Sequence, residues 1–161
     1  MHLLDNVVMF TFLSFVIGVI ADPFLRHVAD YTWLSSRYLL RDQATYESIG
    51  ILWYLRLLDA TPLGSFNRSI HFTRNRDLKT FIVIRDHMAS AEVSHWVGCT
   101  AMLGMTFVAI WYRGFLVGAA YVVFNILGNV YPCLLQQYNK RRLTRLIELA
   151  ERRVRTCNGA S

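Results

Sequence analysis

The strongest constraint on this chain is a run of twenty largely apolar residues, Gly114 to Cys133, that contains Asn125 and Asn129. A run of this length can cross a bilayer as a helix. Polar side chains at that depth are costly, so they usually serve helix packing or function. The run therefore predicts a membrane-spanning helix that carries a polar seam.

Two further apolar runs precede it. Trp96 to Tyr112 has the minimum length for a span, and a tight turn at Arg113-Gly114 connects it to the next run. The first run is expected to end at Pro23, and its opening Met-His-Leu-Leu-Asp lacks the positive charge of a secretory signal. The pattern predicts an all-α integral membrane helical bundle, formed by a single domain over 1–161 with spans near 3–21, 96–112 and 114–135.

Composition supports a membrane protein. Hydrophobic residues make up 54% of the chain and the mean hydropathy is +0.30, against an apolar share of about 45–50% in soluble domains. The net charge of +6 is concentrated in the tail, 140–161, which holds seven basic and two acidic residues. A basic block after an apolar run marks a cytoplasmic flank. This places the protein in the plasma or inner membrane, and no nucleic-acid motif accompanies the block.

The polar middle, residues 24–95, is expected to be interfacial or cytoplasmic. Its aromatic side chains are typical of the headgroup region, and the spacing around 49–57 predicts one or two helices lying on the membrane. Thr61-Pro62-Leu63-Gly64 should break the second helix, and 65–79 should be irregular. A longer helix should start at Asp77 or Thr80. The tail predicts an amphipathic helix with Leu143, Ile147, Ala150 and Val154 on one side.

Glu92 and His95 are the candidates for catalysis. Three residues apart on a helix, they share a face, so the carboxylate could orient the imidazole that removes a hydroxyl proton. The plainer explanation is an ordinary polar entry to a membrane helix. His87 and Glu92 also have the spacing of a His-x4-acid acyltransferase box, although a regular helix points them apart. Arg85 lies near the Glu92 face and could pair with it.

The second candidate site is a set of carboxamides. Uniform helical periodicity places Asn125, Asn129, Gln136 and Asn139 within about 80° of one another. Such amides either bind a ligand or hold membrane helices together, and both explanations remain open. One Glu-x-x-His supplies only half of a di-iron site, and the three cysteines lack paired spacing. No metal and no cofactor are expected.

The motifs resemble a known family. Glu92-Val-Ser-His95-Trp96, and then Asn129-Val-Tyr131-Pro132 followed by Gln136-Gln-Tyr-Asn-Lys-Arg-Arg142, are similar to the glycosyl-4,4'-diaponeurosporenoate acyltransferases of carotenoid biosynthesis. Gln137 and Lys140 stand where the family pattern has arginine. An anion contact at either position is therefore expected to be weakened.

The resemblance implies a membrane O-acyltransferase that moves a fatty acyl group from acyl-CoA or acyl carrier protein to a hydroxyl of a glycolipid. His95 would be the general base and Glu92 its orienting carboxylate. The donor phosphates or an acidic carrier would meet Lys140, Arg141 and Arg142. A noncatalytic lipid-binding or assembly subunit, packed against a membrane-protein partner or a second copy, is the alternative. The residues implied to bind substrate are Asn125, Asn129, Gln136, Tyr138, Asn139, His87 and Arg85.

Overall fold

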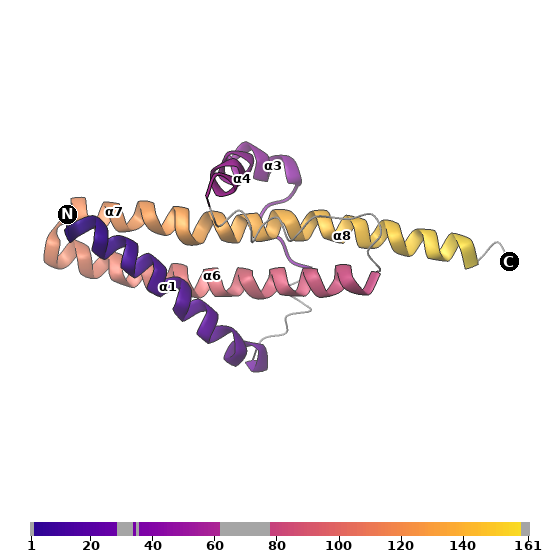
Figure 1. The fold of residues 1–161 in the computed structure, drawn as a ribbon, viewed down its shortest axis with the longest axis horizontal. Coiled ribbons are helices and arrows are strands. Elements are labelled where there is room, and N and C mark those ends of the chain that lie inside the picture. Colours follow the sequence, from indigo (N-terminus) through magenta and orange to yellow (C-terminus); the bar gives the residue numbers. More distant parts are fainter. Residues whose placement is uncertain (1, 29–33, 35, 62–77, 159–161) are drawn as a thin grey trace. The chain divides into compact units, whose positions relative to one another are not determined.

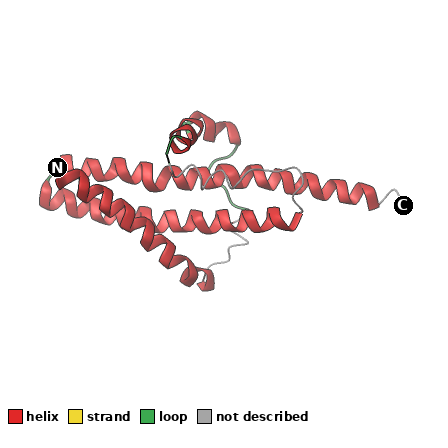
Figure 2. Cartoon of the chain, in the orientation of Figure 1, coloured by secondary structure: helices red, strands yellow, loops and turns green. Residues whose placement is uncertain are grey.

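The computed structural model describes residues 2–28, 34, 36–61 and 78–158, and every regular element in these residues is a helix (Figures 1 and 2). The predicted all-α fold is therefore confirmed. The elements are α1 (His2–Val28), α3 (Gln43–Ser48), α4 (Ile51–Asp59), α6 (Leu78–Arg113), α7 (Phe115–Asn125), the π-helical segment η1 (Ile126–Val130) and α8 (Tyr131–Asn158).

Three helical stretches are long and apolar enough to cross a membrane, as the sequence predicted. They are Asn6–His27, Leu78–Arg113 and Phe115–Arg152. The last two meet at Gly114, whose φ of 91° lies in the region that side chains disfavour, which suits the predicted tight turn. Large apolar side chains such as Phe12, Phe107 and Trp111 are exposed on these helices. Exposed apolar side chains of this size are what a lipid-facing surface requires.

The prediction that Pro23 ends the first helix is wrong, because α1 continues to Val28. Proline removes one backbone hydrogen bond, but its fixed φ is compatible with a helix. Asp22 and Arg26, one helical turn apart on either side of the proline, form an ion pair with 2.9 Å between Oδ2 and Nε. This pair supports the last turns of the helix.

The chain divides into two compact units. The first comprises residues 1–31 and 90–134, and the second comprises 32–89 and 135–161. In the first unit, α1 lies beside α7 and η1, and a cluster of Val7, Met102, Ala109 and Tyr121 forms the core. At Gly118 on α7 an added Cβ would lie 2.2 Å from Ile110 of α6, so a glycine is required for this close helix contact.

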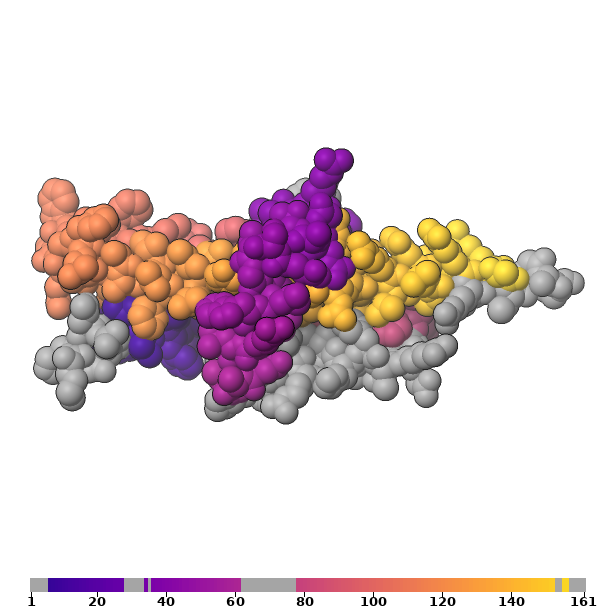
Figure 3. Space-filling model, turned by 90° about the horizontal axis from the view of Figure 1, so that it is seen from above, coloured from indigo at the N-terminus to yellow at the C-terminus, as the bar shows by residue number. Residues whose placement is uncertain are grey.

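In the second unit, the apolar face of α8 forms the core by burying Leu143 and Ile147 against Phe81 and Met88. The predicted amphipathic tail helix is thus confirmed for these residues. The segment 36–61 packs over α8 (Figure 3). Two helices, α3 and α4, occupy this segment, as expected, and Asp42 caps α3 by accepting a hydrogen bond from the Thr45 backbone N–H at 2.8 Å. Of the predicted irregular stretch 65–79, residues 65–77 lie outside the described residues.

A π-helical turn interrupts the last long helix directly before Pro132. The Tyr131 backbone N–H bonds to the carbonyl of Ile126, five residues earlier. Such a turn inserts about one residue, which rotates the rest of the helix by about 100°. The uniform wheel that placed the asparagines on one face with Gln136 and Asn139 therefore does not apply beyond Val130.

Candidate active site

A buried chain of hydrogen bonds links the three membrane helices in the first unit. Asn129 Nδ2 donates to Ser14 Oγ on α1 at 3.2 Å and to Asn125 Oδ1 at 2.9 Å. Asn125 Nδ2 in turn donates to the Cys99 carbonyl on α6 at 3.2 Å. The two asparagines thus hold α1, α6 and the last helix together, which is the packing role that amides serve in membrane proteins.

The same network determines which way the Asn129 amide faces. Ser14 Oγ donates its proton to the Thr11 carbonyl at 2.8 Å, so it can only accept from Asn129. Asn125 Oδ1 is also an acceptor, because its own Nδ2 is used on Cys99. Both partners therefore require the nitrogen of Asn129. Its oxygen, Oδ1, is left without a hydrogen bond among the described residues, although Asn129 is 0% exposed.

His95 is the neighbour of this oxygen. The imidazole is 9% exposed and packs on Phe15 of α1, with ring centroids 5.7 Å apart. His95 Nδ1 has no hydrogen-bond partner within the described part of the chain, yet the ring and the Asn129 side chain interact. Two side chains that interact therefore each carry a buried polar atom with no hydrogen-bond partner among the described residues. Such atoms are rare in proteins and are often found where chemistry takes place.

Glycines make this approach sterically feasible. An added Cβ at Gly98, one turn after His95, would lie 2.6 Å from Asn129 Oδ1 and 2.9 Å from the Ser14 carbonyl. At Gly18 on α1 it would lie 2.0 Å from the Ser94 carbonyl. Both positions need a hydrogen atom in place of a side chain. The backbones of α1 and α6 are therefore in close contact near His95.

Glu92 lies one turn before His95 on α6 and is only 1% exposed. It shares the buried side of the helix with His95, as the three-residue spacing predicted. In the second unit, His87 is exposed, and Arg85 Nε lies 3.7 Å from Asp86 Oδ1 in an ion pair.

In the second unit, polar side chains near the start of α8 hydrogen-bond to the segment 36–61. Gln137 Oε1 accepts hydrogen bonds from the Leu39 backbone N–H at 2.7 Å and from the buried Tyr46 hydroxyl at 2.6 Å. Tyr138 donates to Glu47 Oε1 at 3.0 Å. Gln137 thus acts as an acceptor here, a role that an arginine could not fill.

The basic residues assigned to a donor phosphate differ in their surroundings. Lys140 is 0% exposed, donates to the Leu34 carbonyl at 2.9 Å and lies over the Tyr38 ring. Arg141 stacks on the same ring and donates to the carbonyls of Leu40 and Arg41. Arg142 is exposed, Gln136 is half-buried and Asn139 is buried. Of the three basic residues, Arg142 is the one at the surface.

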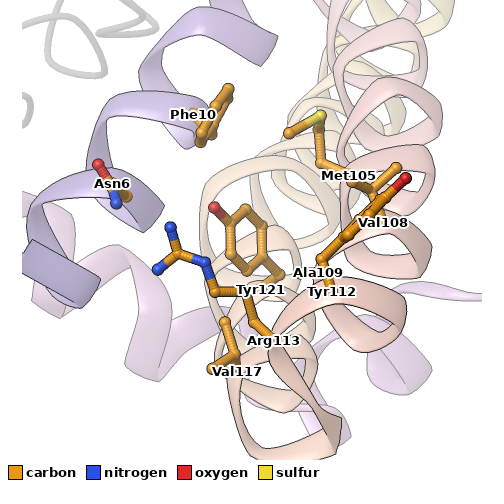
Figure 4. Close-up of a pocket in the computed structure, with 9 residues that line it drawn as sticks. All are labelled: Asn6, Phe10, Met105, Val108, Ala109, Tyr112, Arg113, Val117 and Tyr121. Carbon is orange, nitrogen blue, oxygen red and sulfur yellow. The ribbon is translucent and has the colours of Figure 1, made fainter.

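A cavity of about 170 Å³ lies elsewhere in the first unit, beside the turn between α6 and α7 (Figure 4). None of the residues predicted for the site lines it. A shallower apolar hollow of about 470 Å³ is lined by Trp96, Val97, Thr100 and Ala101, which come after His95 on α6.

Sequence reasoning did not single out Ser14, Gly18 or Gly98. Thr11, Ser14 and Gly18 succeed one another at helical spacing along α1, and small residues at that spacing mark close helix contacts in membranes. This signal was available in the sequence. The interaction of His95 with Asn129 was not, because it depends on how two helices dock.

A family model for glycosyl-4,4'-diaponeurosporenoate acyltransferase matches residues 30–149, well over half of the chain. The chain belongs to this family. The protein is therefore an acyltransferase of carotenoid biosynthesis, and its apolar helices are those of a membrane protein. No curated protein and no solved structure matches it.

Proposed function

We propose that this acyltransferase moves a fatty acyl group from an acyl thioester to a sugar hydroxyl of a glycosylated carotenoid or a related glycolipid, with His95 as the general base. The observation that supports this most is the pair of buried, unused atoms, His95 Nδ1 and Asn129 Oδ1. A histidine packed tightly for structure alone would be expected to have both ring nitrogens satisfied.

In this proposal Asn129 orients the base. When Nδ1 carries the proton, it can donate to Asn129 Oδ1, which leaves Nε2 deprotonated and able to accept a proton. Cysteine proteases use a His–Asn pair in the same way. Glu92, one turn away on the same buried side, would stabilise the imidazolium that forms.

The proton and the acyl group move in two steps. The acceptor hydroxyl gives its proton to His95 Nε2 as its oxygen attacks the thioester carbonyl. The tetrahedral intermediate then collapses to the ester and expels the thiolate, which takes the proton back from the imidazolium. General base catalysis of this kind contributes about 100- to 10,000-fold. The amide nitrogens of Asn125 and Asn129 already donate to other groups, so the proposal gives them no part in binding the oxyanion.

The surface of α6 offers room for a lipid chain. An apolar hollow along Trp96, Val97 and Thr100 could hold an acyl or polyene chain, although helical spacing places it on another face of α6 than His95. For the donor, we propose that the exposed Arg142 and the basic tail attract the phosphates of acyl-CoA or the acidic face of a carrier protein from the cytoplasmic side. Lys140 and Arg141 hold the backbone at Leu34 and Leu40 in place and would act indirectly.

The test is acyl transfer by purified protein in detergent, with a glycosylated diaponeurosporenoate as acceptor and acyl-CoA or acyl carrier protein as donor. His95→Ala should lose about 100-fold or more of the wild-type kcat. His27→Ala, at an exposed position on α1, is the matched control and should retain activity. Full activity of His95→Ala would reject the proposed base. A selective loss in His87→Ala would favour the His-x4-Glu box instead.

A further inference from the structure

The cavity at the α6–α7 turn combines polar and apolar walls. Arg113, the Tyr121 hydroxyl and the Asn6 amide come from three different helices and lie at one end of it (Figure 4). The remaining walls are mainly apolar and include Phe10, Met105 and Val117. A cavity with these two characters is suited to an amphiphile, a molecule with a polar head and an apolar tail.

The polar groups are unused. Tyr121 is only 5% exposed, yet its hydroxyl has no hydrogen bond among the described residues. Arg113 and Asn6 also have none there, and the guanidinium is close enough to act electrostatically on the tyrosine. A cation, a phenol and an amide that converge without partners can all donate hydrogen bonds to one anion.

The position of the cavity indicates a lipid. Trp111, Tyr112, Phe115 and Leu116 are all exposed around the turn. Aromatic side chains in this arrangement mark the boundary between hydrocarbon and headgroups. Arg113 ends a helix that is long and apolar enough to cross a membrane, so its charge is expected near the headgroups of one leaflet.

We propose that this cavity binds an anionic phospholipid. Its phosphate contacts Arg113 and Tyr121, and the part of an acyl chain nearest the headgroup lies along Phe10 and Val117. The site is separate from the proposed catalytic residues, because Arg113 comes 18 positions after His95 on α6, a rise of about 27 Å. The bound lipid would hold the ends of α1, α6 and α7 together.

The experiment measures lipid retained by the purified full chain in native mass spectrometry, with phosphatidylglycerol and phosphatidylcholine offered at equal concentration. The wild type should retain at least five times more phosphatidylglycerol. Arg113→Gln should abolish this preference, Arg113→Lys should restore part of it, and Tyr121→Phe should weaken it. Arg56→Gln, an exposed arginine on α4, is the matched control and should behave as wild type.

Equal retention of the two lipids by the wild type would overturn the proposal, as would a loss of the preference in Arg56→Gln equal to that in Arg113→Gln. Stronger retention of a free fatty acid than of phosphatidylglycerol would also overturn the proposal. Displacement of phosphatidylglycerol by inorganic phosphate alone would likewise assign the cavity to another anion. Failure of His95→Ala to lose activity would refute the proposed base and leave this result unaffected.

Discussion

Replacing Gly18 by alanine should separate α1 from α6. The new Cβ would lie 2.0 Å from the Ser94 carbonyl oxygen and 2.8 Å from its carbon. Both atoms belong to the α6 backbone, so no side-chain rotation relieves the overlap. The helices must part by about 1 Å to reach 3.0 Å, a distance below which real Cβ contacts essentially do not occur.

The cost can be estimated from three terms. Overpacking of this kind costs about 1–3 kcal/mol, and alanine recovers up to about 1 kcal/mol of helix propensity. A movement of about 1 Å would also stretch the hydrogen bond from Asn129 Nδ2 to Ser14 Oγ, now 3.2 Å, beyond its range. That bond is worth roughly 0.6 kcal/mol in a membrane protein. The net destabilisation should be about 2 kcal/mol.

Thiol labelling during thermal unfolding measures this change, because Cys99 and Cys133 are buried, form no disulfide and should react only when the fold opens. A Cys157→Ser background removes the tail thiol. Gly104→Ala is the matched control on α6, since its Cβ would meet nothing within 4 Å, and it should unfold at the wild-type temperature or slightly above. Unchanged unfolding of Gly18→Ala would show that the close contact of α1 and α6 does not exist.

Two further predictions concern the second unit. Gln137→Leu removes the acceptor of the buried Tyr46 hydroxyl, which should cost about 1–3 kcal/mol of stability. Limited proteolysis should therefore cut residues 36–47 faster than in the wild type. The control variant Gln136→Leu should be as resistant to proteolysis as the wild type. The hydrogen bond from the Thr45 backbone N–H holds the pKa of Asp42 below its ordinary 3.8. The cap of α3 should therefore be stable at neutral pH, and it should weaken only as the pH falls below that value. Asp42→Asn should keep the cap and lose this acid sensitivity in hydrogen exchange.

The helices and their order could be predicted from the sequence, because apolar runs of membrane length, the Gly114 turn and the amphipathic tail are local signals. The Pro23 boundary could not, since the Asp22–Arg26 pair supports helical turns that the proline alone would weaken. The π-turn at η1 was also missed. Its effect on helix register depends on an Ile126–Tyr131 backbone bond that no residue pattern announces.

The sequence singled out candidate site residues that the structure buries, and their role in a site stays a prediction. Glu92, His95 and Asn129 were singled out from spacing, and all three are buried in the first unit. Their relation to one another could not be derived, because it depends on the depth at which α1 docks through Gly18 and Gly98. The surroundings of Lys140 were not predicted from the sequence. A basic residue in a basic block was expected to meet an anion, yet it is buried on a backbone carbonyl.

The most direct test of the central claim is a double-mutant cycle on kcat with His95→Ala, Asn129→Leu and the double variant. If Asn129 acts through His95, both single variants should be slow, and the double variant should be no slower than His95→Ala alone. Losses that multiply in the double variant would show that the two residues act independently and would contradict the proposed base and its orientation.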